Sequence, residues 1–533
     1  MENNTTSNET PIRDGVSSED RTNQNTTQTN ITRDFEELAH ECILGRYVLI
    51  VGSECILDPN IHNGDSLQWL INKTGLRSMQ QEELNGQLSD LEVKIEEANS
   101  NEEIARLEEE KTKVRQQLRA YRSEPHPISD YLVGKDVMNV KRDMRREMEN
   151  YVYTEDSINP QLLKLLETRC FRVIITTAID KHLETALRRI WGNELKVLNI
   201  NSCTKKDWDT QLVNNEFCDA PPTLYYAFGC LDNETEDDFV LSEDDAMRVI
   251  NKWGNDKPTR FGNYISNKSS NSKNFKYILS MGCQLDNWQF RFFWYQLLGE
   301  HLVDRCIKAR VAMTWDDNLK LRNHIENFWN FSPVDNTQEF INNLCRAIHN
   351  KLFIELETNP QDYVFISYAH QDQCRAYNLA LLLKEKGISV WIDSKLGADG
   401  LSNNYTQRIH NAINNCKVFL PLFTHETSEC LINKQLKQES QSKGVNSPQL
   451  MDNDFTRYFF YEWYLCDCQI KEKAKISVIP VVYSGFVNSE TVQKEVFEEC
   501  FKRSKFETNR FSSLDLLVEQ IKGEINLQNQ PQL

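Results

Sequence analysis

Two series of short, continuous apolar runs limit the folds that this chain can adopt. Before residue 300 the runs are RYVLIVG, FRVIITT, TLYYAFG and KYILSMG, and stretches with helical spacing, such as 160–168 and 180–191, lie between them. Beyond residue 360 the runs are DYVFISY, ISVWID, KVFLPLF and ISVIPVVY. Strands that are apolar on both faces belong to parallel sheets that helices cover on both sides. We therefore predict an α/β fold with two parallel-sheet domains.

Composition along the chain predicts the domain boundaries. Residues 1–32 are Asn, Thr, Ser and charged residues with almost no aliphatic side chain, so we expect a disordered tail. We expect the first α/β domain at 33–312, a helical connector at 313–360 and the second domain at 361–528, followed by a short tail at 529–533.

A different pattern interrupts the first domain at residues 78–123. Apolar side chains recur there at spacings of three and four residues in two stretches, and between them Ser100 and Glu103 form the signature of a capping box. The pattern predicts an inserted antiparallel helical hairpin. It is either an arm for self-association or for a partner, or a solvated strut, because a heptad pattern does not identify what pairs with it.

Charge limits the partners of the protein. The sequence has 61 Lys and Arg residues against 79 Asp and Glu residues, a formal net charge of -18, and no basic block. Nucleic acids and anionic membranes repel a surface of this charge. We expect no general nucleic-acid binding and no membrane binding.

The cysteines and the first residues indicate the compartment. None of the 15 cysteines forms a CxxC pair, so we expect neither a metal site nor a disulfide framework. The first residues lack the apolar segment of a signal peptide, and no apolar run approaches the roughly 20 residues that span a membrane. We expect a cytoplasmic protein with reduced thiols.

Six motifs follow one another in the second domain: FISYAHQD, GISVWID, LGADGLSNN, YTQRIHNAINNC, KVFLPLF and YFFYEWYL. With these motifs, residues 361–527 resemble the Toll/interleukin receptor (TIR) family. The resemblance implies a flavodoxin-like sheet, in which ligands bind at the carboxyl ends of the strands. It also implies an activity, because many TIR domains cleave the bond between nicotinamide and ribose in NAD.

The same resemblance implies the site residues. Glu462 matches the catalytic glutamate of the family, on the helix after the third strand. Nicotinamide is a positively charged leaving group, so a carboxylate that stabilises an oxocarbenium-like ribose meets the main chemical demand. Trp391 either stacks on a ring of the nucleotide or fills the core. The positions that match nucleotide-facing residues of the family are Ser367, Tyr368, Ala369, Lys395, Leu396 and Gly397.

The choice of Glu462 has alternatives. An insertion at 429–453 separates the third strand from its helix and leaves Glu426 and Glu429 as rival acids. We prefer Glu462 because the helical spacing places it beside a buried apolar stripe that includes Phe459. The contrary interpretation is that Glu462 is a solvated helix residue, which is the commoner position for glutamate.

Four segments of the first domain, VLIVGSEC, IITTAIDKHLETAL, TLYYAFGCLD and ILSMGCQLDNWQ, resemble the Rossmann-type sirtuin-like family, which binds NAD. The chemical residues differ. Phe228 stands where the family has its histidine base, and Ala178 stands where it has an asparagine. The resemblance with these losses implies a pseudoenzyme or sensor. Whether it still binds a nucleotide stays open, and the residues that would contribute are Gly52, Thr176, Thr177 and Asp286.

Together these features predict an NAD glycohydrolase that hydrolyses or cyclises NAD, which is its substrate; no cofactor is expected. Resemblance to bacterial anti-phage effectors implies activation by TIR–TIR self-association into a homo-oligomer, with an unknown trigger sensed by the first half of the chain. The alternative is a non-catalytic TIR adaptor that acts through TIR–TIR contacts. A sirtuin-type deacylase is disfavoured by Phe228 and Ala178.

Overall fold

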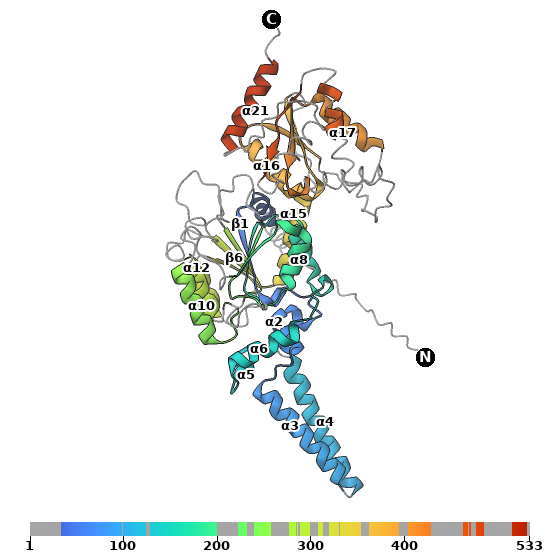
Figure 1. Cartoon of the computed structure of the whole chain (residues 1–533), viewed down its shortest axis with the longest axis vertical. Coiled ribbons are helices and arrows are strands. Elements are labelled where there is room, and N and C mark those ends of the chain that lie inside the picture. Colours follow the sequence, from blue (N-terminus) through green and yellow to red (C-terminus); the bar gives the residue numbers. More distant parts are fainter. Residues whose placement is uncertain are drawn as a thin grey trace, which may run out of the picture.

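The computed structural model of the protein contains two parallel sheets, one in each half of the chain (Figure 1). The described residues are 34–98, 100–123, 128–199, 222–231, 239–256, 277–283, 285, 288–298, 308–312, 319–329, 331–352, 362–393, 403–427, 462–466, 468–470, 476–483 and 514–529. The predicted tail at 1–32, residues 396–402 of the LGADGLSNN motif and the 429–453 insertion lie outside them. Among the described helices, none is long and apolar enough to cross a membrane.

The first sheet has seven strands in the order β3-β4-β2-β1-β5-β6-β7, and all of its pairs are parallel. Its strands are β1 (Tyr47–Val51), β2 (Val173–Thr176), β3 (Lys196–Asn199), β4 (Thr223–Tyr226), β5 (Tyr277–Met281), β6 (Lys308–Ala312) and β7 (Phe331–Val334). Alternate residues of β1 enter different clusters, since Leu49 and Val51 face one core and Val48 and Ile50 face another. The predicted sheet that is buried on both faces is confirmed.

Helices cover both faces of this sheet. They include a helix over 34–43, α7 (Pro160–Glu167), α8 (His182–Trp191), α10 (Glu243–Asp256) and α12 (Trp288–Leu298). Three further helices, α2 (Ser66–Lys73), α5 (Ile128–Leu132) and α6 (Val137–Met148), pack around a separate apolar cluster. The start of α7 shows why the sequence folds this way. The Asn159 side chain accepts hydrogen bonds from the backbone N–H groups of Gln161 and Leu162, and Pro160 occupies the first turn, where no N–H is needed.

The region 313–360 differs from the expectation of connecting helices alone. Helix α14 (Leu319–Phe328) leads into β7, which pairs with β6 and extends the first sheet. Helix α15 (Thr337–Leu352) follows β7 and precedes the second sheet in the chain. The four residues of β7 include Pro333 and are too short to show a strand period in the sequence.

At residues 78–123 the chain forms α3 (Met79–Glu97) and α4 (Asn101–Ser123), which project away from the first sheet (Figure 1). Their apolar side chains bury one another, and Lys111 pairs with Glu92 at 3.1 Å across the seam. The buried seam consists of Leu84, Leu91, Leu107, Val114 and Leu118. The apolar pattern is thus satisfied within the hairpin.

The second sheet has five strands in the order β11-β10-β8-β9, with β12 also paired to β10, and all of its pairs are parallel. Its strands are β8 (Tyr363–Ser367), β9 (Ser389–Ile392), β10 (Val418–Phe423), β11 (Ser477–Val478) and β12 (Val481–Val482), and its helices include α16 (Gln373–Glu385), α17 (Asn403–Asn415) and α21 (Leu514–Asn529). The run ISVIPVVY was predicted as one strand. Pro480 divides it, because proline has no N–H to donate to the ladder.

Helix α16 joins the two domains. Leu379, Leu382 and Leu383 face the interior as the sequence predicts, but Arg375 and Asn378 are buried as well. The Asn378 amide donates to the backbone oxygen of Ile43 in the first domain, at 3.2 Å. One apolar cluster runs through both domains. The helix is therefore covered on one side by its own sheet and on another by the first domain.

At the carboxyl ends of β1 and β5, Gly52 and Gly282 are in close contact. A Cβ atom added to Gly52 would lie 1.9 Å from the backbone oxygen of Gly282, so the space allows no side chain. We expect Gly52→Ala to lower the free energy of unfolding by about 3 kcal/mol, because an overpacked interior must shift its backbone. Urea denaturation of the purified chain measures this.

Gly86→Ala is the matched control for this prediction. Gly86 lies in α3, is exposed, and has no atom within 4 Å of an added Cβ. The same methyl group should there raise the free energy of unfolding by about 0.5 to 1 kcal/mol, because alanine favours the helix. Equal effects of the two substitutions would contradict the close contact.

Candidate functional site

Glu462 lies in a helix over 462–466 and reaches the carboxyl end of the central strand β8. Its side chain is only 4% exposed. The interpretation of Glu462 as a solvated helix residue is therefore wrong. A buried acid needs a specific partner, since an unpaired polar group in the interior is costly.

The partner of Glu462 is Ser367, the last residue of β8. Its hydroxyl donates to Oε2 of Glu462 at 2.6 Å, and the indole N–H of Trp463 donates to the same hydroxyl at 3.2 Å. All three side chains are buried. Two of the residues that the TIR resemblance implies, Ser367 and Glu462, are thus brought into direct contact.

Burial raises the pKa of Glu462 well above its ordinary value of 4.5. The hydrogen bond from Ser367 opposes this shift, and the nearby charge of Asp393 adds to it. A raised pKa favours the neutral acid. We call this arrangement, in which Glu462 is buried and hydrogen-bonded to Ser367, the closed state of the site.

A second polar group lies at the end of β9, next to β8 in the sheet. Asp393 is buried and its Oδ1 accepts from the Arg408 guanidinium of α17 at 2.5 Å. The Tyr368 hydroxyl donates to the backbone oxygen of Asp393 at 2.6 Å. Sequence reasoning did not select Asp393 or Arg408. The available signal was a carboxylate directly after a buried strand, at the edge where ligands bind in such sheets.

The other implied positions have different surroundings. Ala369 is buried at the start of a short 3-10 helix, η5 (His370–Asp372). Trp391 stacks on Phe365 with ring centroids 4.7 Å apart, among the apolar side chains beneath α17. Lys395, Leu396 and Gly397 lie outside the described residues.

The rival acids do not share the place of Glu462. Glu426 forms an ion pair at 2.7 Å with Arg169 of the first domain. Glu429 lies outside the described residues. Among the acids that we considered, Glu462 is the one whose contact with the end of β8 the structure describes.

In the first domain, the residues of the sirtuin-like pattern are engaged internally. The Thr176 hydroxyl donates to the backbone oxygen of Val51 at 3.0 Å, and the Thr177 hydroxyl lies 3.7 Å from the Cys283 sulfur. Phe228 packs against Phe290 and Phe293. Asp286 lies outside the described residues.

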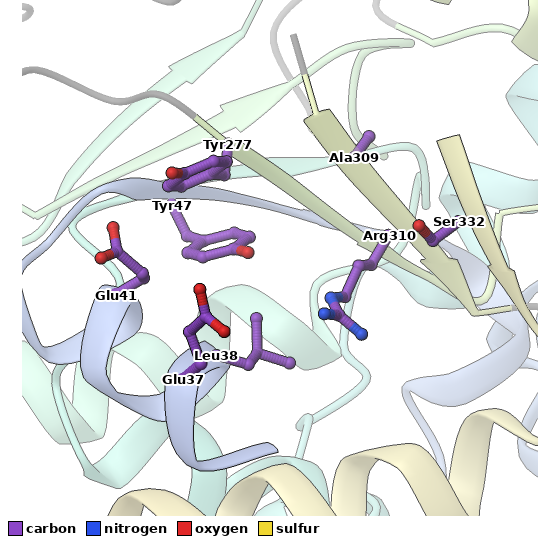
Figure 2. Close-up of a pocket in the computed structure, with 8 residues that line it drawn as sticks. All are labelled: Glu37, Leu38, Glu41, Tyr47, Tyr277, Ala309, Arg310 and Ser332. Atoms are coloured by element: carbon purple, nitrogen blue, oxygen red, sulfur yellow. The ribbon is translucent and has the colours of Figure 1, made fainter. Parts of the chain in front are cut away.

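A cavity of about 300 Å³ opens at the amino ends of the first sheet, opposite the edge of the sirtuin-like pattern (Figure 2). The rings of Tyr47 and Tyr277 stack in its wall at 5.1 Å. Two of its charged groups have partners within the chain, since Glu41 pairs with Arg46 and Arg310 pairs with Asp34. The charge of Arg310, the basic residue in the lining, is therefore already compensated by a carboxylate.

Comparison with known families supports the assignment of the second half. Residues 364–510 match the family model described as the TIR domain. A search among curated proteins found no match to the chain. The five parallel strands and this match identify a TIR domain in the C-terminal part of the protein.

The raised pKa of Glu462 predicts a dependence of stability on pH. A carboxyl whose pKa is higher in the folded chain contributes its full stability below the unfolded pKa and loses it as the pH rises through the folded value. Glu462→Gln keeps the shape and does not titrate. We expect the difference in melting temperature, variant minus native chain, to grow as the pH rises above about 4.5.

Thermal melts at closely spaced pH values test this expectation. Glu519→Gln, at an exposed position of α21, is the control and should track the native chain at every pH. A constant offset for Glu462→Gln across the range would show that the Glu462 carboxyl titrates equally in the folded and unfolded chains.

Proposed function

We propose that the TIR domain cleaves the bond between nicotinamide and ribose in NAD, with Glu462 as the catalytic residue. The observation that supports the proposal most is the buried pair of Ser367 and Glu462 at the carboxyl end of the central strand of a TIR domain. Ligands bind at this edge in open parallel sheets. The second observation is the raised pKa of Glu462, a property that recurs at catalytic acids.

The chemistry requires little from the protein. When nicotinamide leaves, its ring nitrogen takes the bonding electrons and becomes neutral, while positive charge develops on the ribose carbon. An ionised Glu462 would stabilise that charge and hold the ribose hydroxyls. Water completes hydrolysis to ADP-ribose and releases a proton; attack by the adenine of the same molecule would instead give cyclic ADP-ribose.

The closed state holds Glu462 in the wrong form for this step. Glu462 is covered, and burial raises its pKa and so disfavours the ionised form that the ribose step needs. Activity therefore needs a movement that exposes Glu462 and lowers its pKa. We propose that self-association of TIR domains in a cytoplasmic homo-oligomer accompanies this movement, in a bacterial response to phage. The support for that setting is the family resemblance of the two domains.

The first domain acts in this proposal as a sirtuin-like regulator without catalysis. Phe228 occupies the place of the histidine base and is held in an aromatic cluster, so no general base is available there. The trigger that it responds to would act on the first half of the chain.

A non-catalytic TIR adaptor is the second candidate. One observation favours it: the acid of the closed state is buried and paired with Ser367, as a purely structural residue would be. An adaptor would keep Glu462 covered when its TIR domains associate.

Release of nicotinamide from NAD by the purified full-length chain at high concentration separates the two candidates. We expect release by the native chain and at least about 100-fold less by Glu462→Gln, because the variant cannot stabilise the developing charge. Glu519→Gln, an exposed residue of α21, should retain native activity. Equal release by the native chain and Glu462→Gln would remove Glu462 from the mechanism.

A further inference from the structure

Four charged side chains are buried together where the two domains meet. Arg172 and Glu194 belong to the first domain, and Asp372 and Arg375 belong to the TIR domain. Oε1 of Glu194 lies 3.4 Å from Arg172 Nη1 and 3.3 Å from Arg375 Nη2, and Arg375 Nη1 lies 2.8 Å from Asp372 Oδ1. Each of the four side chains is between 1% and 4% exposed. We call these four residues the interdomain cluster.

The geometry of the interdomain cluster ties the domains to one relative position. One glutamate oxygen serves two guanidinium groups, one from each domain, so separation would leave charges without their partners. The guanidinium groups also lie over rings, Arg172 over Trp191 at 4.3 Å and Arg375 over Tyr483 at 4.6 Å. Burial raises the pKa of Glu194, but Arg375 and Arg172 outweigh it and hold that pKa below its ordinary value.

The interdomain cluster continues into the loops that border the closed site. Asp372 ends η5, which directly follows Ser367, Tyr368 and Ala369. Oδ2 of Asp372 accepts a hydrogen bond at 2.5 Å from the hydroxyl of Thr424, the residue that directly follows β10. Glu426, two residues after Thr424, pairs with Arg169 of the first domain. Both the segment 368–372 after β8, through Asp372 and Arg375, and the described residues 424–427 after β10 are thus tied to the first domain.

We propose that the interdomain cluster is an autoinhibitory latch, which holds the first domain on the TIR domain and thereby keeps the loops after β8 and β10 in the closed state. The inference rests on the proposed function, since it concerns the regulation of the same site. It explains why an acid suited to NAD cleavage is covered in the resting chain. Opening the interface would free η5 and allow Ser367 to release Glu462.

The interface contains its own reporter. Cys170 of the first domain and Cys374 of α16 are buried thiols that are not joined in a disulfide, and their sulfur atoms lie 3.0 Å apart. A disulfide needs an S–S distance of about 2.0 Å, so a small movement of side chains suffices. Diamide takes one hydrogen from each thiol as the S–S bond forms, and peptide mapping by mass spectrometry identifies the Cys170–Cys374 link. Cys374→Ala is the blank for that link.

The test compares Glu194→Gln with the native chain in two assays. The substitution removes the negative charge between the guanidinium groups of Arg172 and Arg375, while Asp372 still pairs with Arg375. The contact across the interface is thereby weakened, so we expect the Cys170–Cys374 link to form about tenfold more slowly and nicotinamide release to rise about tenfold. Glu109→Gln, in an exposed ion pair with Lys113 on α4, is the matched control and should leave both rates unchanged. The linked native chain should release no nicotinamide until dithiothreitol breaks the link.

Circular dichroism checks that Glu194→Gln folds. If it does not, Arg169→Met serves instead, because it removes the less buried pair with Glu426, together with a hydrogen bond to the backbone oxygen of Ile190, and keeps an apolar stem over Trp191. It should slow the link and raise nicotinamide release in the same directions.

The outcomes separate the latch from the proposed function. Slower linking with faster release supports both. An unchanged rate of linking overturns the latch, and so does slower linking with unchanged, measurable release. Slower linking with no release by any of the chains, under any of these conditions, upholds the docking contact and overturns both NAD cleavage and the autoinhibition of it.

Discussion

Helix α16 is packed between the TIR sheet and the first domain, and the relation of the two domains depends on that constraint. Its leucines contribute to the core of the TIR domain, while Arg375 and Asn378 reach the first domain. A helix that is buried on two sides cannot carry unpaired charge. Arg375 therefore needs Glu194 from one domain and Asp372 from the other, and the two domains share one apolar cluster.

This packing gives a physical account of a resting state. Ser367, which binds Glu462, and Asp372, which binds Arg375, lie on one short segment after β8. Arg375 in turn binds Glu194 of the first domain. Coupling between the site and the interface then needs no long pathway. It needs only that this segment has two conformations, one with the Ser367–Glu462 hydrogen bond and one without it. Phe228 and Ala178 are core residues of the first domain, which is compatible with the regulatory part proposed for it.

The sequence predicts the parallel sheets because their strands are apolar on both faces, and it predicts Ser367 and Glu462 through the order of the TIR motifs. It does not predict the burial of Glu462, since glutamate is usually exposed and burial depends on the whole TIR core. The second buried face of α16 carries the polar residues Arg375 and Asn378, so the spacing of apolar residues in the sequence cannot reveal that this face is buried. The interdomain cluster joins residues about 180 positions apart, which no local spacing connects.

The burial of Glu462 against Ser367 is the central claim, and because burial raises the pKa of this carboxyl, we predict that Glu462 is protonated in the resting chain. Infrared difference spectroscopy between the native chain and Glu462→Gln at neutral pH measures it directly. The account predicts the C=O stretch of a neutral carboxylic acid that is present in the native chain and missing from the variant. A difference spectrum with the bands of a carboxylate would contradict the account, since Glu462 would then be ionised in the resting chain.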